Sequence, residues 1–185
     1  TLDATDFWSR SWDGGDDDWT PRFAVENGPY VPIASTVFPL KRRALANLVE
    51  LEQYSDGAAI NQRLAPTGAG EVDGKRLGLI SHGLPALGLL ENLDQSELPL
   101  SLLKLGMTYP LPRARVREFL EQHDEVLVVE ELDRVLEQEI KVIALEEGLA
   151  CRIRSRTDPE DLMGELGPER TWKLLAETWP AAFPA

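Results

Sequence analysis

Residues 102–133 read LLKLGMTYPLPRARVREFLEQHDEVLVVEELD, and this stretch decides the fold. It contains two short apolar runs, 102–107 and 126–129, and the segment between them has the spacing of a helix. The second run directly follows the helical segment and is flanked by charged residues on both sides. Such a run is typical of a central parallel strand covered on both faces. The stretch therefore predicts a β-α-β unit.

Prolines and one aspartate mark where the helices of this unit begin. Pro110 and Pro112 end the first apolar run and can open the helix, since proline is tolerated in the first helical turn. Asp133 suits the N-cap of the next helix, which we expect to begin there. Helical spacing predicts the buried sides of the two helices, which are Val116, Phe119 and Leu120 in the first and Val135, Leu136, Ile140 and Ile143 in the second.

The alternation of strands and helices continues on both sides of this unit. Further strands are expected at residues 77–81 and 150–153, and further helices at 84–93 and from Pro168 onward. Gly148 is expected to end the long helix, and Trp172, Leu175 and Trp179 to share one face of the last helix. This rhythm predicts an α/β fold with a mainly parallel sheet.

The first 59 residues differ from the rest in composition. Residues 1–22 form an acidic arm in which Trp8, Trp12 and Trp19 surround four aspartates. A calcium loop that began at Asp13 would need a glutamate at its twelfth position, where Ala24 stands. We therefore interpret these residues as an arm and not as a calcium site.

A linker and a helix are expected to connect the arm to the α/β domain. Residues 23–40 contain several prolines and no period, which indicates an extended linker. Residues 41–54 predict a helix that Gly57 ends in a left-handed conformation. We therefore predict an arm, linker and helix over 1–59 and a compact domain over 60–185.

Composition and charge argue against several classes of partner. The 185 residues include 32 acidic and 19 basic side chains, for a formal net charge of −13. Nucleic acids and anionic membranes need basic surface, so neither is an expected partner. No apolar run reaches the roughly 18 residues of a membrane-spanning helix, and no signal peptide is visible. We expect a cytoplasmic protein and, because the first residue is Thr1, a piece of a longer one.

Two local features could suggest chemistry but favour structural roles. The glycine-rich loop at 67–75 precedes a strand, whereas a dinucleotide-binding loop follows a strand and opens a helix, so we expect a turn. The single cysteine, Cys151, excludes an internal disulfide and a cluster held by this chain alone. We expect it to fill the core within the last strand.

Residues that follow predicted strands are the candidates for contacts. Ligands of parallel α/β sheets bind at the carboxyl ends of the strands, where helix N-termini attract anions. Ser81 to Gly83 follow one strand, and Glu130 and Glu131 follow another. Adjacent strand residues face opposite sides, so the two carboxylates do not form a pair, and one is expected to cap a helix or lie in an interface. We predict interface or ligand contacts, and no catalytic, cofactor or metal residues, at His82, Tyr109, Glu130 and Glu131.

Tyr109 is predicted to lie on a contact surface. It stands between Thr108 and Pro110, whose proline restricts the backbone, so its ring is presented at little entropic cost. Tyrosine in such a position is a frequent interface anchor. The alternative is that the ring covers the helix at Val116.

Several segments resemble one enzyme family. KLGMTYPLP followed by VREFLEQHDEVLVVEELD is similar to the alpha subunit of indolepyruvate:ferredoxin oxidoreductase, and this central motif is specific. The resemblance extends over residues 28–175 and includes GPYVPIASTVFPLKRRAL, the segment from Tyr54 to Asn61, RLGLISHGL and DLMGELGPERTWKLL. It implies the transketolase C-terminal-like fold, with three layers (α/β/α) and a mainly parallel five-stranded sheet. The one antiparallel edge strand would be residues 60–64.

The resemblance also implies a parent enzyme with thiamine diphosphate, Mg²⁺ and [4Fe–4S] clusters. That enzyme would oxidatively decarboxylate an aryl 2-oxoacid to an acyl-CoA and pass electrons to ferredoxin. This chain has neither the Gly-Asp-Gly run with its asparagine pair nor the cysteine runs of that family, so we expect no cofactor in it. We expect a non-catalytic structural and assembly domain, with the remaining alpha-subunit domains, a beta subunit, ferredoxin and CoA as partners of the parent enzyme.

Two other functions remain open at this point. One is a free-standing α/β module that binds a nucleotide or another anion at Ser81 to Gly83. The other is an assembly domain in a different thiamine-dependent enzyme. A Gly-Asp-Gly motif and cysteine runs downstream in the reading frame would support the domain of an indolepyruvate:ferredoxin oxidoreductase, and a stop codon directly after Ala185 would support the free-standing module.

Overall fold

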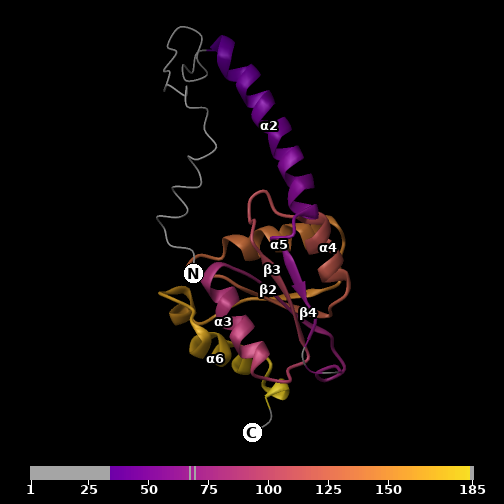
Figure 1. Ribbon diagram of the computed structural model, residues 1–185, viewed down its shortest axis with the longest axis vertical. Coiled ribbons are helices and arrows are strands. Elements are labelled where there is room, and N and C mark those ends of the chain that lie inside the picture. Colours follow the sequence, from indigo (N-terminus) through magenta and orange to yellow (C-terminus); the bar gives the residue numbers. More distant parts are fainter. Residues whose placement is uncertain (1–33, 67, 69, 184–185) are drawn as a thin grey trace, which may run out of the picture. The chain divides into compact units, whose positions relative to one another are not determined.

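The computed structural model describes residues 34–66, 68 and 70–183 (Figure 1). Its elements are, in chain order, α2 (Ala34–Gly57), β1 (Gln62–Leu64), β2 (Leu77–His82), α3 (Gly83–Asp94), β3 (Leu100–Leu105), α4 (Arg113–Glu121), β4 (Glu125–Val129), α5 (Val135–Glu146), β5 (Arg152–Arg154), the short 3-10 helix η1 (Pro159–Leu162), α6 (Pro168–Thr178) and a second 3-10 turn, η2 (Pro180–Ala182). The arm predicted at 1–22 lies outside the described residues. The α/β body treated below belongs to the compact unit that begins at Ala46.

The five strands form one sheet in the order β1-β3-β2-β4-β5. β2 pairs in parallel with both β3 and β4, β4 pairs in parallel with β5, and β1 runs antiparallel to β3. The prediction of a mainly parallel five-stranded sheet with one antiparallel edge strand is confirmed. The edge strand begins at Gln62, slightly later than expected. The predicted β-α-β unit is also confirmed, although β2 lies between its two strands.

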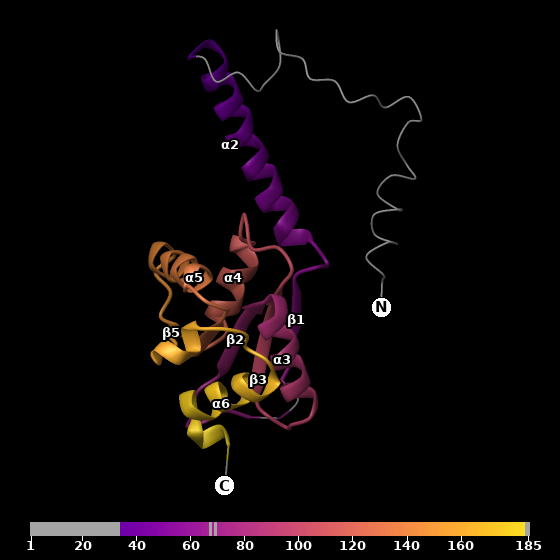
Figure 2. The ribbon, with the colours of Figure 1, turned by 90° about the vertical axis from the view of Figure 1, so that its left-hand side faces the viewer.

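Two layers of helices cover the sheet, which gives the expected α/β/α arrangement. α3 and α6 lie side by side on one face, and α4 and α5 lie side by side on the other (Figures 1 and 2). Every residue of β4 is buried, and successive side chains of a strand point to opposite sides, so both faces of the sheet are covered at β4. Leu127 and Val129 belong to the core under α3 and α6, and Val126 and Val128 to the core under α4 and α5.

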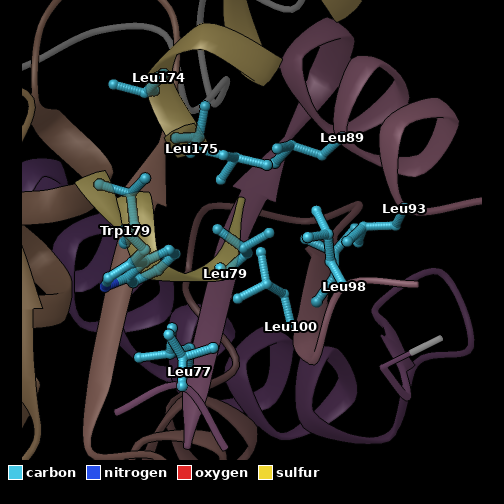
Figure 3. Packing of buried hydrophobic residues seen from close by; sticks show 14 of the residues in the cluster. Leu77, Leu79, Leu89, Leu93, Leu98, Leu100, Leu174, Leu175 and Trp179 are labelled. Carbon is cyan, nitrogen blue, oxygen red and sulfur yellow. The ribbon is translucent and has the colours of Figure 1, made fainter. Parts of the chain in front are cut away.

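The core under α3 and α6 consists mainly of leucines. Figure 3 shows the leucines of the two helices directed toward those of the strands, with the Trp179 ring beside Leu77 and Leu79. Asn92 of α3 donates from Nδ2 to the Thr171 hydroxyl (2.9 Å), which joins the two helices by a polar contact. On the opposite face, Phe119 packs against the backbone of β2 at Gly78, where an added Cβ would lie 2.8 Å from the ring.

The predictions about α2, Gly148 and the glycine-rich loop are confirmed in part. The helix at 41–54 is confirmed, but the linker predicted up to residue 40 is wrong from Ala34 onward, since α2 begins there. Pro39 lies inside α2 near its start, where it removes only one backbone hydrogen bond. The left-handed cap at Gly57 is also wrong, whereas Gly148 does have a left-handed φ of 63°. In the loop, residues 72–75 form the expected tight turn, closed by two backbone hydrogen bonds of 3.0 Å.

The C-terminal helices correct two side-chain predictions. Leu136, Ile140 and Ile143 are buried as expected, but Val135 is 64% exposed. Val135 precedes Leu136 by one residue and is therefore rotated by about 100° away from the buried side. On α6 the buried side centres on Thr171, Leu174 and Leu175, so Trp172 at its flank is 40% exposed and contacts Phe183 edge-to-face.

The domain boundary predicted at 59/60 stays a prediction. Within the described residues, no helix combines the length and the apolar character that crossing a lipid bilayer requires.

Candidate functional site

The sheet brings all four predicted contact residues to one edge. The chain passes from β2 to β3 on one side and then crosses to β4 on the other, so the topological switch point lies between the carboxyl ends of β2 and β4. Ser81 is in register with Val129, which places His82 and Glu130 next to each other in the continuation of these strands. Tyr109 follows β3, the other neighbour of β2. We call the residues 82–84, 106–112 and 130–134, which follow these three strands, the carboxyl edge.

The end of β2 is occupied by contacts within the fold. The Ser81 hydroxyl is buried and donates to the carbonyl oxygen of Val129 at 2.6 Å, which links two strands. His82 is half-buried and precedes α3, but its side chain makes no hydrogen bond to the helix N-terminus. Gly83 has a left-handed φ of 62°, and Pro85 carries no N–H group. The polar groups free for a ligand at this end are therefore few.

The N-terminus of α4 is capped by a side chain from the end of α2. The Asp56 carboxylate oxygen Oδ1 accepts hydrogen bonds from the backbone N–H groups of Ala114 (3.0 Å) and Arg115 (3.3 Å). In return, the Arg115 guanidinium donates to the carbonyl oxygens of Asp56 and Asn61. A carboxylate is stabilised at a helix N-terminus by the free N–H groups and the helix dipole. The position at which α4 could bind an external anion is thus filled.

Asn61 fixes the β3–α4 connection by hydrogen bonds at both ends of its amide. Its Oδ1 accepts from the backbone N–H groups of Gly106 (2.9 Å) and Met107 (3.1 Å), and its Nδ2 donates to the carbonyl and hydroxyl oxygens of Ser55. A Cβ on Gly106 would lie 2.2 Å from the Ile60 side chain, so the glycine permits this close approach. Asn61 is itself buried, and it holds the backbone that leads to Tyr109.

Glu130 caps α5 from the end of β4. Its two carboxylate oxygens accept hydrogen bonds from the backbone N–H groups of Leu136 (2.8 Å) and Glu137 (2.9 Å), and the side chain is buried. The expectation that one of the two carboxylates caps a helix is confirmed. The N-cap predicted at Asp133 is wrong, because α5 begins at Val135 and the charged Glu130 side chain reaches the N–H groups from the strand end.

The side chain of Glu131 points in a different direction from that of Glu130, as expected for adjacent residues at the end of a strand. Its Oε1 accepts from the backbone N–H of Leu166 at 3.0 Å, which joins the carboxyl edge to the segment before α6. The two carboxylates therefore do not form a catalytic pair. Whether His82, Tyr109, Glu130 and Glu131 also contact a ligand or partner stays a prediction.

The turn after Glu131 is held by a buried arginine that sequence reasoning missed. Leu132 has a left-handed φ of 56°, although it is not a glycine. The Arg156 guanidinium donates to the carbonyl oxygens of Leu132 (3.2 Å) and Asp161 (2.7 Å) and is almost completely buried. Burial lowers the pKa of Arg156, and the opposite charges of Glu130 and Glu137 act against this shift. The one sequence signal for such a role is the group of alternating arginines at positions 152, 154 and 156.

Apolar side chains at and beside the carboxyl edge are exposed. They are Ile60, Leu84, Tyr109, Leu132 and Val135. Tyr109 is 76% exposed, whereas Val116 is completely buried, so the alternative that Tyr109 covers the helix at Val116 is wrong. The bond between Tyr109 and Pro110 is cis. The edge thus combines polar groups that are hydrogen-bonded within the domain with apolar side chains that are exposed.

The amino ends of the strands carry a second group of charged residues. Burial raises the pKa of Glu125, but Lys75 (2.6 Å), Trp179 Nε1 (3.2 Å) and Arg154 (2.9 Å) outweigh it, so the pKa is lowered. Each of these contacts joins β4 to a different segment of the domain. The cluster is therefore a structural one.

His123 and Cys151 lie near this end and are not poised for catalysis. His123 is buried, and its Nδ1 donates to the carbonyl oxygen of Phe119 at 2.6 Å. Burial lowers the pKa of His123. Cys151 is half-buried and stands just before β5, not within it, and burial raises the pKa of its thiol to about 11. A thiol with that pKa is protonated at neutral pH and is a poor nucleophile.

The fold and its carboxyl edge define a doubly wound α/β domain in which carboxylates of the domain itself cap the N-termini of α4 and α5. The chain belongs to the indolepyruvate oxidoreductase domain family, which matches residues 70–166, more than half of its length.

The chain is also similar to curated proteins named indolepyruvate oxidoreductase subunit IorA. The chain is 33% identical over 129 residues to the indolepyruvate oxidoreductase subunit IorA of Methanothermobacter marburgensis, a match that covers 70% of this chain and 20% of the relative. It is 32% identical over 108 residues to the subunit IorA of Archaeoglobus fulgidus, covering 58% of this chain and 16% of the relative. The chain thus spans about a fifth of the length of the curated relatives that it matches.

Proposed function

We propose that the chain is a structural and assembly domain in the alpha subunit of an indolepyruvate:ferredoxin oxidoreductase, with a transketolase C-terminal-like fold. Its family membership supports the choice of enzyme. The observation that carries the assembly role is the state of the carboxyl edge, where the domain's own carboxylates fill the N-termini of α4 and α5. Asp56 caps α4 and Glu130 caps α5. What the edge offers to a partner is therefore apolar side chains.

The parent enzyme in this proposal is a thiamine-diphosphate enzyme. It decarboxylates an aryl 2-oxoacid oxidatively to an acyl-CoA, transfers the electrons to ferredoxin, and works in the cytoplasm with a beta subunit. The described residues do not supply the set of cysteines that a [4Fe–4S] cluster needs. They include one cysteine, and among them no group of three or more His, Cys, Asp or Glu side chains could hold a metal ion. The proposal therefore assigns thiamine diphosphate, Mg²⁺ and [4Fe–4S] clusters to other domains of the parent enzyme.

A module that binds an anion at Ser81 to Gly83 is the second candidate. The one observation in its favour is that the N-terminus of α3 has no side-chain cap. Against it, the Ser81 hydroxyl is already bonded to Val129, and Pro85 removes one of the N–H groups that would face an anion. The assembly role therefore accounts for more of the edge.

Tyr109→Ala in the full-length alpha subunit tests the assembly role. Its ring is 76% exposed, so truncation should leave the melting temperature of the isolated 185-residue chain within about 2 °C of the parent, as is usual for surface positions. Association of the alpha subunit with the beta subunit, measured by size-exclusion chromatography and calorimetry, should weaken about tenfold or more, as expected for an aromatic anchor. Unchanged association would contradict the proposal, and a large loss of stability in the isolated chain would then show that Tyr109 serves the domain's own packing.

A further inference from the structure

Leu132 combines two features that do not help the isolated domain. Its φ of 56° lies in the left-handed region, which residues with a Cβ rarely adopt. Its side chain is also 56% exposed to water. Glycine or asparagine would adopt this backbone conformation more readily and would expose no apolar surface. Leucine at this position is therefore unfavourable on both counts within the described part of the chain.

The surrounding structure holds Leu132 in this conformation from three sides. Glu130 is bonded to the N-terminus of α5, and Glu131 to the backbone N–H of Leu166. The buried Arg156 donates to the carbonyl oxygen of Leu132 itself at 3.2 Å. A strained backbone persists only where its neighbours fix it, and such positions concentrate at functional sites. The turn therefore presents the leucine side chain in one defined place.

The neighbouring groups indicate what kind of surface this side chain would meet. The two carboxylates that precede it, Glu130 and Glu131, direct their oxygens to backbone N–H groups of the domain, whereas the side chain of Asp133, which follows it, is exposed to water. Val135, three residues further on, is 64% exposed and extends the apolar surface. An apolar pocket is thus the surface complementary to the side chains of Leu132 and Val135.

We propose that Leu132 is a preorganised apolar anchor that inserts into an apolar pocket on the remainder of the alpha subunit. About four fifths or more of the length of the two relatives named above lies outside the match, so in those proteins the domain shares its polypeptide with a much larger remainder. An anchor fixed in advance loses little conformational entropy when it binds, which raises affinity. This inference rests on the proposed assembly role and assigns it to a particular residue.

Thiol labelling measures directly whether Leu132 is covered. Leu132→Cys is made in a Cys151→Ser background, in both the isolated chain and the full-length alpha subunit, and alkylation of the introduced cysteine by a maleimide is timed by peptide mass spectrometry, which separates it from other cysteines of the full-length subunit. The rate should be at least tenfold lower in the full-length subunit. Leu145→Cys is the matched control, since Leu145 is an 81% exposed leucine on α5 away from the carboxyl edge, and it should react at similar rates in both proteins.

Equal labelling of Leu132→Cys in the two proteins would overturn the proposal. So would a rate in the isolated chain that falls as protein concentration rises, because the occupant would then be a second copy. As an independent readout, Leu132→Asn should raise or preserve the melting temperature of the isolated chain, and a clear decrease would refute the strain argument. If Tyr109→Ala weakens subunit association but Leu132→Cys stays accessible, only this inference fails; if Tyr109→Ala is also silent, the proposed function fails with it.

Discussion

Replacement of Glu130 by glutamine tests how much the domain depends on the carboxylate that caps α5. The change preserves the volume of the side chain, so it creates no cavity, but it removes the charge and turns one acceptor into a donor. In the native structure both oxygens accept backbone N–H groups, at 2.8 and 2.9 Å, from a buried position. In Glu130→Gln the side-chain NH₂ group must therefore face one of these N–H groups, which is left without an acceptor.

The expected loss of stability follows from these contacts. An unpaired buried backbone donor costs about 1–3 kcal/mol, and the loss of a favourable charge at a helix N-terminus adds about 0.3–1 kcal/mol. A total of about 3 kcal/mol is a large part of the roughly 5–15 kcal/mol that stabilise a domain. For a chain of this size, each kcal/mol lowers the melting temperature by about 2–4 °C, so Glu130→Gln should melt about 6–12 °C below the parent.

Differential scanning calorimetry at neutral pH, with urea unfolding as a second method, provides the measurement. Glu139→Gln is the control, because Glu139 lies on the exposed side of the same helix and the charge change is identical. The control should melt within about 2 °C of the parent. If Glu130→Gln were as stable as Glu139→Gln, the carboxylate would not cap α5. The description of the carboxyl edge as hydrogen-bonded within the domain would then lose its main support.

Two further predictions concern the core and the pH dependence of stability. Val128→Asp should unfold the domain or destabilise it by several kcal/mol, because it places an unpaired charge in a strand buried on both faces, and a circular dichroism melt within a degree or two of the parent would contradict this. His123 has a pKa that burial lowers below its ordinary value of 6.5, so the unfolded chain binds the proton more readily than the folded one. The free energy of unfolding should therefore decrease as the pH falls below about 6.5, and the decrease should be smaller in His123→Gln; identical pH profiles would show that the histidine is not responsible.

Much of the fold could be predicted because the decisive pattern is local. Residues 126–129 are apolar without interruption and bounded by charge, and only a strand covered on both faces accommodates that pattern. The antiparallel edge strand was different, since Gln62–Leu64 has no distinctive pattern and was expected only from the family resemblance. Its pairing with β3 depends on residues 40 positions away in the chain.

The polar contacts of the carboxyl edge could not be predicted in the same way. Local capping rules chose Asp133 for α5, but a longer side chain at Glu130 reaches the same N–H groups and carries its charge into a buried site. Asp56 caps a helix that begins 57 residues later, and Arg156 holds a turn 24 residues earlier. Such partners are set by the tertiary packing of the sheet, so no spacing in the sequence signals them.

Catalysis by the isolated chain is the measurement that tests the central claim most directly. The reduction of a viologen dye that depends on indolepyruvate is followed anaerobically with thiamine diphosphate, Mg²⁺ and CoA supplied, first for the 185-residue chain and then for the full-length alpha subunit with its beta subunit. A structural and assembly domain predicts no turnover by the chain above the protein-free background, and turnover by the complete enzyme under the same conditions. Sustained turnover by the chain alone would contradict the assignment, because the reacting groups would then have to lie within it.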